Sequence, residues 1–218
     1  MKIIITGTTG MIGEGILLEC FSDNRITEIL SVSRKRTGKS HPKLKEYIFE
    51  DFLSIKHDDS RLKGYDACFF CAGVSSLGMN QKEYERITYN NTLHFAKALD
   101  PNPNLSFIYV SGGGTDSTEK GRLHWARIKG KTENDLMKLP FKQAFGFRIG
   151  MVKPAKGQLH TLKMYNYLSW ILPIISKLFP SIANTMKEVA NAMIHVATYG
   201  FERNIIFVKD IHQLSNKR

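Results

Sequence analysis

The first fifteen residues constrain the fold of this chain more than any other stretch of its sequence. Residues 3–5 are three isoleucines, a β-branched run that is long enough for a buried strand and too short for a helix. Glycines follow at Gly7, Gly10 and Gly13, and the apolar residues after them recur with helical spacing. A strand, a glycine-rich turn and a helix in this order predict a βαβ unit that binds a dinucleotide.

Each of the three glycines has its own expected role in such a turn. Gly7 allows the chain to turn sharply, Gly10 lets backbone N–H groups reach a pyrophosphate, and Gly13 lets the helix pack closely on the strand. The pyrophosphate would lie at the helix N-terminus, where unpaired N–H groups and the helix dipole favour an anion. A glycine-rich turn without a ligand is the alternative. We therefore expect the whole turn to bind the cofactor, through Gly7, Thr8, Thr9, Gly10, Met11, Ile12 and Gly13.

The end of the second expected strand, residues 28–33, bears on the choice of cofactor. In a dinucleotide-binding fold an acidic residue at this position binds the ribose 2′-hydroxyl of NAD, whereas an arginine accommodates the 2′-phosphate of NADP. This chain has Arg34 there, followed by further basic residues. Guanidinium groups pair well with phosphate, so the sequence favours NADP over NAD. The alternative is a solvated basic loop.

Strand-like and helix-like segments alternate along the rest of the chain. Further strands are expected near residues 45–49, 65–71, 105–110, 144–149 and 204–208, and helices near 81–99, 120–138, 159–178 and 185–199. This alternation predicts an α/β fold of the Rossmann type, a doubly wound parallel sheet with helices on both faces. We expect the 218 residues to form a single domain in which residues 151–200 contribute a small substrate-facing lobe.

Composition narrows the class of ligand and the compartment. The net charge of +11 is spread along the chain, which favours an anionic small ligand over nucleic acid, with plain solubility as the alternative. The three cysteines fit a reducing compartment, and Cys68 and Cys71 would point to opposite faces of a strand, so no metal site is expected. Residues 165–179 are too interrupted by polar residues for a transmembrane segment. With no secretory leader pattern, we expect a cytoplasmic protein.

Several further motifs resemble those of the short-chain dehydrogenase/reductase superfamily, in its atypical epimerase-like branch. The similarity rests on residues 6–13, 71–73, 109–111, 125–133 and 148–150 and covers most of the chain. It implies a nicotinamide cofactor whose adenine is bordered by Asp51 and Phe52. It also implies that Lys129 holds the nicotinamide ribose, and that the path to the nicotinamide is lined by Cys71, Ala72 and Gly73.

The resemblance is partial for the catalytic residues. The family has a tyrosine four residues before its lysine, and here that position is Trp125, whose indole has no accessible acid–base couple. The usual serine position is Gly113, so Ser111 is the best remaining hydroxyl for a substrate oxygen. Other candidate acid–base groups are Thr115, His124, Tyr165 and Tyr167.

Three functions are compatible with this pattern. The first is an NADP-dependent oxidoreductase or epimerase-like enzyme that acts on a carbonyl or sugar-nucleotide substrate. The second is a catalytically silent NADP-binding sensor or interaction protein. The third is a peripheral membrane or lipid-handling protein, suggested by the apolar residues of 165–179 beside a positive net charge, although a buried helix or a dimer contact explains the same residues. Helices beside the sheet pair in many members of the superfamily, so a homodimer is compatible with the resemblance.

Overall fold

A seven-stranded parallel sheet forms the centre of the computed structural model, which describes residues 1–161 and 183–217. The strand order is β3-β2-β1-β4-β5-β6-β9, and every pairing is parallel. The strands are β1 (Lys2–Thr6), β2 (Glu28–Ser33), β3 (Leu44–Ile48), β4 (Ala67–Phe70), β5 (Ser106–Val110), β6 (Gln143–Arg148) and β9 (Ile205–Phe207). The predicted Rossmann-type fold is thereby confirmed.

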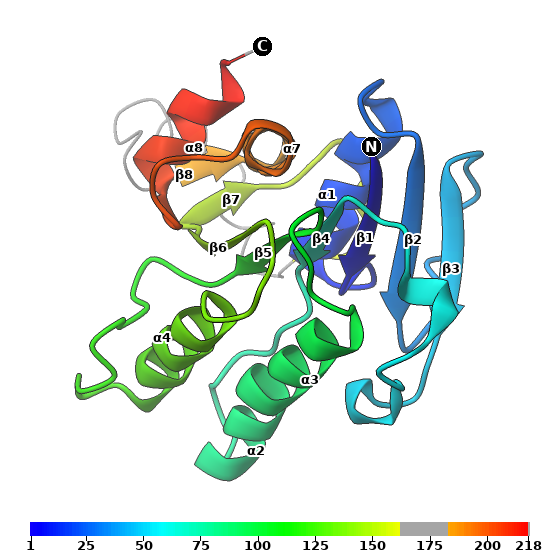
Figure 1. The fold of residues 1–218 in the computed structure, drawn as a ribbon. Coiled ribbons are helices and arrows are strands. Elements are labelled where there is room, and N and C mark those ends of the chain that lie inside the picture. Colours follow the sequence, from blue (N-terminus) through cyan, green and yellow to red (C-terminus); the bar gives the residue numbers. More distant parts are fainter. Residues whose placement is uncertain (162–182, 218) are drawn as a thin grey trace.

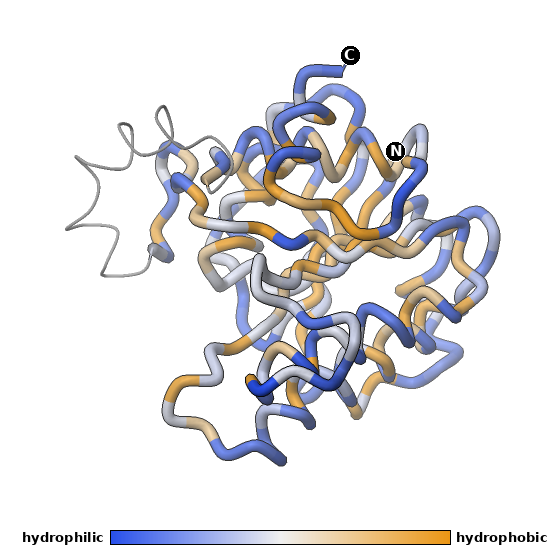
Figure 2. The backbone as a smooth tube through the Cα atoms, turned by 90° about the vertical axis from the view of Figure 1, so that its left-hand side faces the viewer, coloured by the Kyte–Doolittle hydropathy of each residue, from blue (hydrophilic) through white to orange (hydrophobic). Residues whose placement is uncertain are grey.

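Helices cover both faces of this sheet (Figure 1). One face carries α1 (Met11–Ser22), α7 (Met186–Tyr199) and α8 (Val208–Ser215). The other carries α4 (His124–Leu136) and the consecutive segments α2 (Gln81–Glu85), η3 (Arg86–Asn90) and α3 (Asn91–Ala98). Hydrophobic residues run along the central strands, while the outer loops are mostly hydrophilic (Figure 2).

The isoleucine run of β1 lies between the two hydrophobic cores. Ile3 and Ile5 belong to the core under α1 and α7, whereas Ile4 belongs to the core under α3 and α4. All three side chains are fully buried. A strand in the middle of a parallel sheet is covered on both faces, so it needs apolar residues at successive rather than alternate positions. This explains why the first strand is an uninterrupted apolar run.

The helices differ from the prediction in two places. The helix expected over 81–99 is continuous but contains the π-helical turn η3, which widens it in the middle. The helix expected from residue 120 begins at His124, because Asp116 accepts hydrogen bonds from Thr118 and Gly121 and holds the preceding residues in a loop. Helix α8 was not predicted from the sequence. It follows β9 directly and buries Val208, Ile211 and Leu214 on one face.

A small second sheet lies outside the main one. It pairs β7 (Met151–Lys153) with β8 (Ala183–Thr185) in parallel. The helix expected over 159–178, the apolar segment 165–179, and the candidates Tyr165 and Tyr167 lie outside the described residues. Within the described part of the chain, no helix has the length and apolar character needed to cross a membrane. Two 3-10 turns, η1 (Phe52–Ser54) and η2 (Ser60–Leu62), complete the described elements.

Candidate functional site

The glycine turn after β1 is packed too closely for any larger residue at two of its positions. Gly7 has a φ of +69°, and a Cβ there would lie 2.7 Å from the backbone nitrogen of Ala72. At Gly13 a Cβ would lie 2.2 Å from the carbonyl oxygen of Gly7. The turn is tied to the end of β4 because the Thr6 hydroxyl oxygen accepts hydrogen bonds from the backbone N–H groups of Cys71 and Ala72, each at 3.1 Å.

The N-terminus of α1 is open to a ligand. Gly10 is the N-cap residue, and it has no side chain that could bond to the N–H groups of the first helical turn. The helix dipole and free N–H groups make such an end suited to an anion. Strand β1 lies between β2 and β4, so this end lies at the carboxyl edge of the sheet where the strand order reverses. Open α/β folds bind their ligands at this position.

A pocket of about 480 Å³ lies in front of the glycine turn. Its walls come from the ends of β1, β2, β3 and β4 and from the helix that contains the π-turn. It is lined by Gly7, Thr9, Gly10, Val32, Ser33, Arg34, Phe49, Glu50, Asp51, Phe52, Phe70, Cys71, Ala72, Gly73, Val74, Arg86, Ile87 and Asn91. An extended cleft with a phosphate cradle at one wall and aromatic residues at another fits a dinucleotide. We call it the dinucleotide pocket.

The far wall of the dinucleotide pocket combines aromatic rings with opposite charges. The Phe52 ring packs against Phe49 and Phe70, with centroids 4.5 and 5.5 Å away. Asp51 accepts a hydrogen bond from Arg86 at 3.0 Å. Burial raises the pKa of Asp51. The N–H of Leu53, the Arg86 guanidinium and the charge of Arg34 together outweigh burial, so the pKa of Asp51 lies below its usual value. Asp51 is therefore a carboxylate at neutral pH.

The helix α4 carries Trp125 and Lys129 one turn apart. The indole of Trp125 lies against the backbone of Gly114, where a Cβ would come within 2.7 Å of its Cη2 atom. The Lys129 ammonium lies 6.0 Å from the centre of the Tyr109 ring. Burial lowers the pKa of Lys129 to about 8, although the nearby Glu133 carboxylate acts in the opposite direction. Lys129 can therefore exchange a proton close to neutral pH.

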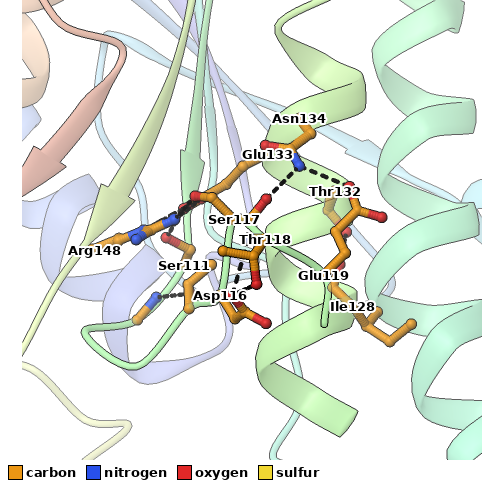
Figure 3. A network of polar contacts seen from close by, with 12 residues as sticks. Ser111, Asp116, Ser117, Thr118, Glu119, Ile128, Thr132, Glu133, Asn134 and Arg148 are labelled. Atoms are coloured by element: carbon orange, nitrogen blue, oxygen red, sulfur yellow. Dashed lines mark hydrogen bonds and ion pairs between the residues drawn. The ribbon is translucent and has the colours of Figure 1, made fainter. Parts of the chain in front are cut away.

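Ser111 belongs to a buried ionic network (Figure 3). Its hydroxyl donates a hydrogen bond of 2.6 Å to the Glu133 carboxylate, and Ser111 is only 5% exposed. Arg148 pairs with the other carboxylate oxygen of Glu133 at 2.6 Å and also contacts the hydroxyl of Ser117. The network joins β5, α4 and β6. The Ser111 hydroxyl already donates its hydrogen to the Glu133 carboxylate. Only the lone pairs of the hydroxyl oxygen are therefore available to another partner.

The structure brings together most, but not all, of the residues expected to hold a cofactor. Those that line the dinucleotide pocket are Gly7, Thr9, Gly10, Arg34, Asp51, Phe52, Cys71, Ala72 and Gly73. Thr8 is instead buried, with its hydroxyl 2.7 Å from that of Ser31. The other residues expected to hold the cofactor, Met11, Ile12, Gly13 and Lys129, are not among the lining residues. The catalytic candidates Ser111 and Trp125 are not among them either.

Sequence reasoning missed the residues that the π-turn contributes. Arg86, Ile87 and Asn91 line the dinucleotide pocket, although no motif marks them in the sequence. A π-turn frequently marks a functional site, but its presence depends on tertiary packing and not on a local sequence signal. Among the other candidates, the Thr115 hydroxyl accepts a hydrogen bond from the Gly112 N–H, and His124 Nε2 lies 3.3 Å from the Gln81 carbonyl oxygen.

Comparison with known proteins gives distant sequence relatives and similar folds. No protein-family model matches the chain. It is 25% identical over 154 residues to the mitochondrial protein FMP52 of Debaryomyces hansenii, covering 69% of this chain and 66% of that protein. It is 23% identical over 158 residues to FMP52 of Chaetomium globosum, covering 70% and 64%. The matched region therefore spans slightly less than two thirds of these relatives.

Solved structures with a similar fold include several that hold NAD. A UDP-glucuronic acid 4-epimerase from Bacillus cereus in complex with NAD has a TM-score of 0.65 and 14% identity, covering 100% of this chain and 85% of that one. A UDP-N-acetylglucosamine 4-epimerase from Methanobrevibacter ruminantium M1 has a TM-score of 0.65 and 18% identity, covering 94% and 75%. The fold is that of NAD(P)-binding epimerases and reductases.

The expectation of a cytoplasmic protein is contradicted by the sequence relatives. The FMP52 proteins of both fungi are named as mitochondrial. The expectation rested partly on the low cysteine count, which separates oxidising from reducing compartments but does not distinguish one reducing compartment from another.

Proposed function

We propose that this chain binds NADP in the dinucleotide pocket and acts as an oxidoreductase or epimerase-like enzyme on a carbonyl or sugar-nucleotide substrate. The proposal rests on one observation: the glycine turn and Arg34 line the same pocket. The pyrophosphate would lie at Gly7 and Gly10, the adenine near Asp51 and Phe52, and the nicotinamide beyond Ala72. Complexes of similar folds with NAD support a nicotinamide dinucleotide as the ligand.

Arg34 is the residue that would select NADP. Its side chain is exposed at the end of β2 and lines the pocket. The second arginine of this wall, Arg86, is already paired with Asp51. Arg34 forms no ion pair with the described residues and acts on Asp51 only through its charge, so its N–H donors are available to the 2′-phosphate.

Calorimetric titration with NADPH and NADH tests this assignment. Arg34→Glu should weaken NADPH binding by about tenfold or more, as expected for a lost charge-assisted contact, and should change NADH binding little. Lys35→Glu is the matched control, since Lys35 is the next exposed cation and does not line the pocket. Equal losses in both variants, or equal binding of NADPH and NADH by the wild type, would contradict selection by Arg34.

The bound cofactor would supply hydride transfer, and the chain would have to supply the proton. Trp125 has no acid–base couple, and the proton of Ser111 is held by Glu133. Lys129, also on α4, is a buried amine whose pKa is lowered to about 8. We infer that Lys129 orients the nicotinamide ribose and exchanges the proton of the substrate oxygen. The small sheet of β7 and β8 falls within residues 151–200, which we propose as the substrate-facing lobe.

Trp125, which has no acid–base couple, favours one alternative, an NADP-binding sensor without turnover. NADPH absorbance measured with carbonyl substrates, and chromatography of the product epimer with sugar-nucleotide substrates, separate the two functions, since epimerisation leaves no net change in NADPH. The enzyme predicts turnover in one of these assays that Lys129→Ala abolishes. Tight NADPH binding without turnover on the whole panel would favour the sensor.

A further inference from the structure

A second pocket, of about 570 Å³, lies on the face of the sheet covered by α1, α7 and α8. It is lined by Arg25, Lys187, Asn191, Ser215, Asn216 and Lys217. These residues come from the loop before β2, from α7, and from the C-terminal end of α8 (Figure 1). Arg25 precedes β2, so the pocket lies toward the amino ends of the strands. None of the described residues lines both this pocket and the dinucleotide pocket, which lies at the carboxyl ends of the strands.

The lining of this second pocket is wholly polar and carries a surplus of positive charge. Arg25 is neutralised by Asp23 at 2.6 Å and also donates a hydrogen bond to the side-chain oxygen Oδ1 of Asn191 at 3.3 Å. Within residues 1–161 and 183–217, neither Lys187 nor Lys217 forms an ion pair. The charge of Lys187 acts on Glu19 only at longer range. Two lysine ammonium groups therefore lack a counter-ion in the described part of the chain.

The positive charges around this pocket affect the pKa of the buried His195. It is 9% exposed, and its Nδ1 atom has no hydrogen-bond partner among the described residues. Burial lowers the pKa of His195, and the charges of Lys217 and Arg25 lower it further, against an opposing contribution from the Lys217 backbone. His195 belongs to α7, the helix that supplies Lys187 and Asn191 to the pocket, so its ring can report a change of charge there.

We propose that this second pocket binds a phosphate group, with Lys187 and Lys217 as the charged ligands and the amide groups of Asn191 and Asn216 as additional donors. Ammonium and amide N–H groups are donors that phosphate oxygens accept, and two ammonium groups match the charge of a phosphate dianion. Among the described residues, the basic side chains that line the dinucleotide pocket are Arg34 and Arg86, so this lining accounts for little of the net charge of +11. The phosphate can belong to a free phosphorylated molecule or to a phospholipid headgroup.

Titration of the full chain with inorganic phosphate, followed by NMR at His195, tests the site. Because the charges of Lys217 and Arg25 act on His195, a saturable shift of the His195 ring signals reports the second pocket. We expect phosphate to raise the pKa of His195, because an anion offsets the two cations that lower it. A His195 signal that phosphate does not move would overturn the proposal.

A double charge reversal identifies the ligands. K187E/K217E should weaken phosphate binding at this site by about tenfold or more, in line with the loss of charge-assisted contacts. K63E/K209E is the matched control, since both lysines are exposed, neither lines the pocket, and the change in net charge is the same. Both variants alter exposed side chains, and their thermal unfolding verifies that they fold. Equal weakening in the two variants would assign the effect to net charge and refute the site.

Vesicles separate the two sources of phosphate. Co-sedimentation with phosphatidylcholine vesicles that contain phosphatidic acid, lost in K187E/K217E and retained in K63E/K209E, would assign a lipid headgroup. Saturable binding of inorganic phosphate without such co-sedimentation would assign a free phosphorylated ligand. Binding of neither would overturn the proposal. None of these measurements depends on NADP, so a failed cofactor titration leaves them unaffected.

Discussion

Glu14, in the first turn of α1, offers a direct measure of how one buried charge stabilises this fold. Its side chain is fully buried, and its carboxylate forms an ion pair with the Lys39 ammonium at 2.8 Å. The same carboxylate accepts hydrogen bonds from the backbone N–H groups of Leu159, at 3.1 Å, and His160, at 2.6 Å. The His160 ring nitrogen Nδ1 lies 2.9 Å away. Glu14 thus ties the loop after β2 and the segment before residue 162 to the helix of the glycine turn.

The pKa shift of Glu14 gives the contribution of these contacts to the free energy of unfolding. Burial raises the pKa, but Lys39 and the N–H groups of His160 and Leu159 outweigh burial and lower it from 4.5 to about 2. A group whose pKa is lower in the folded state stabilises the fold above its unfolded pKa and loses that contribution as the pH falls through the folded pKa. The shift corresponds to about 3 kcal/mol, present at pH 7 and lost between about pH 4.5 and pH 2.

Glu14→Gln tests this value by removing the charge while keeping the shape of the side chain. We expect the free energy of unfolding at pH 7, measured by urea denaturation, to fall by about 3 kcal/mol, the energy of the lost charge. The variant should also lose less stability than the wild type on acidification from pH 4.5. Glu19→Gln is the control on the same helix, since Glu19 is half-buried and the net shift of its pKa is upward. An acid dependence of Glu14→Gln parallel to that of the wild type would refute the reasoning.

Two other predictions concern buried charges of α4 and β6. Arg148→Met should lower the free energy of unfolding by about 3–5 kcal/mol, because it leaves the buried Glu133 carboxylate without its cation. Urea denaturation should show that the double variant E133L/R148M recovers much of this loss, and no recovery would argue against the ion pair as the cause. The lowered pKa of Lys129, about 8, means that the unfolded state binds more protons above that pH. The free energy of unfolding of the wild type should therefore rise between pH 8 and the unfolded pKa of 10.5 by a contribution from Lys129. Lys129→Met should lack this contribution when both proteins are denatured with urea over the same pH range.

Much of the fold could be predicted from local patterns. The isoleucines of β1 and the three glycines after them specify a buried strand and a close turn within a few residues, so neighbouring positions contain the whole signal. Helix α8 was missed because its apolar residues span only two turns, and a strand pattern directly precedes it. The π-turn was missed because its extra residue is accommodated by packing on neighbouring elements, for which the sequence has no local marker.

The sequence by itself determined the parallel α/β architecture, the glycine turn and the position of Arg34 at the end of the second strand, because each depends on residues close together in the chain. Only the tertiary structure decided how side chains from distant segments combine. It placed Arg86 and Asn91 in the dinucleotide pocket, engaged the Ser111 hydroxyl with Glu133, and buried Glu14 under residues 159 and 160. It also brought Lys187 and Lys217 to one pocket. Burial, and the pairing of charges that burial requires, arise only when the elements pack together.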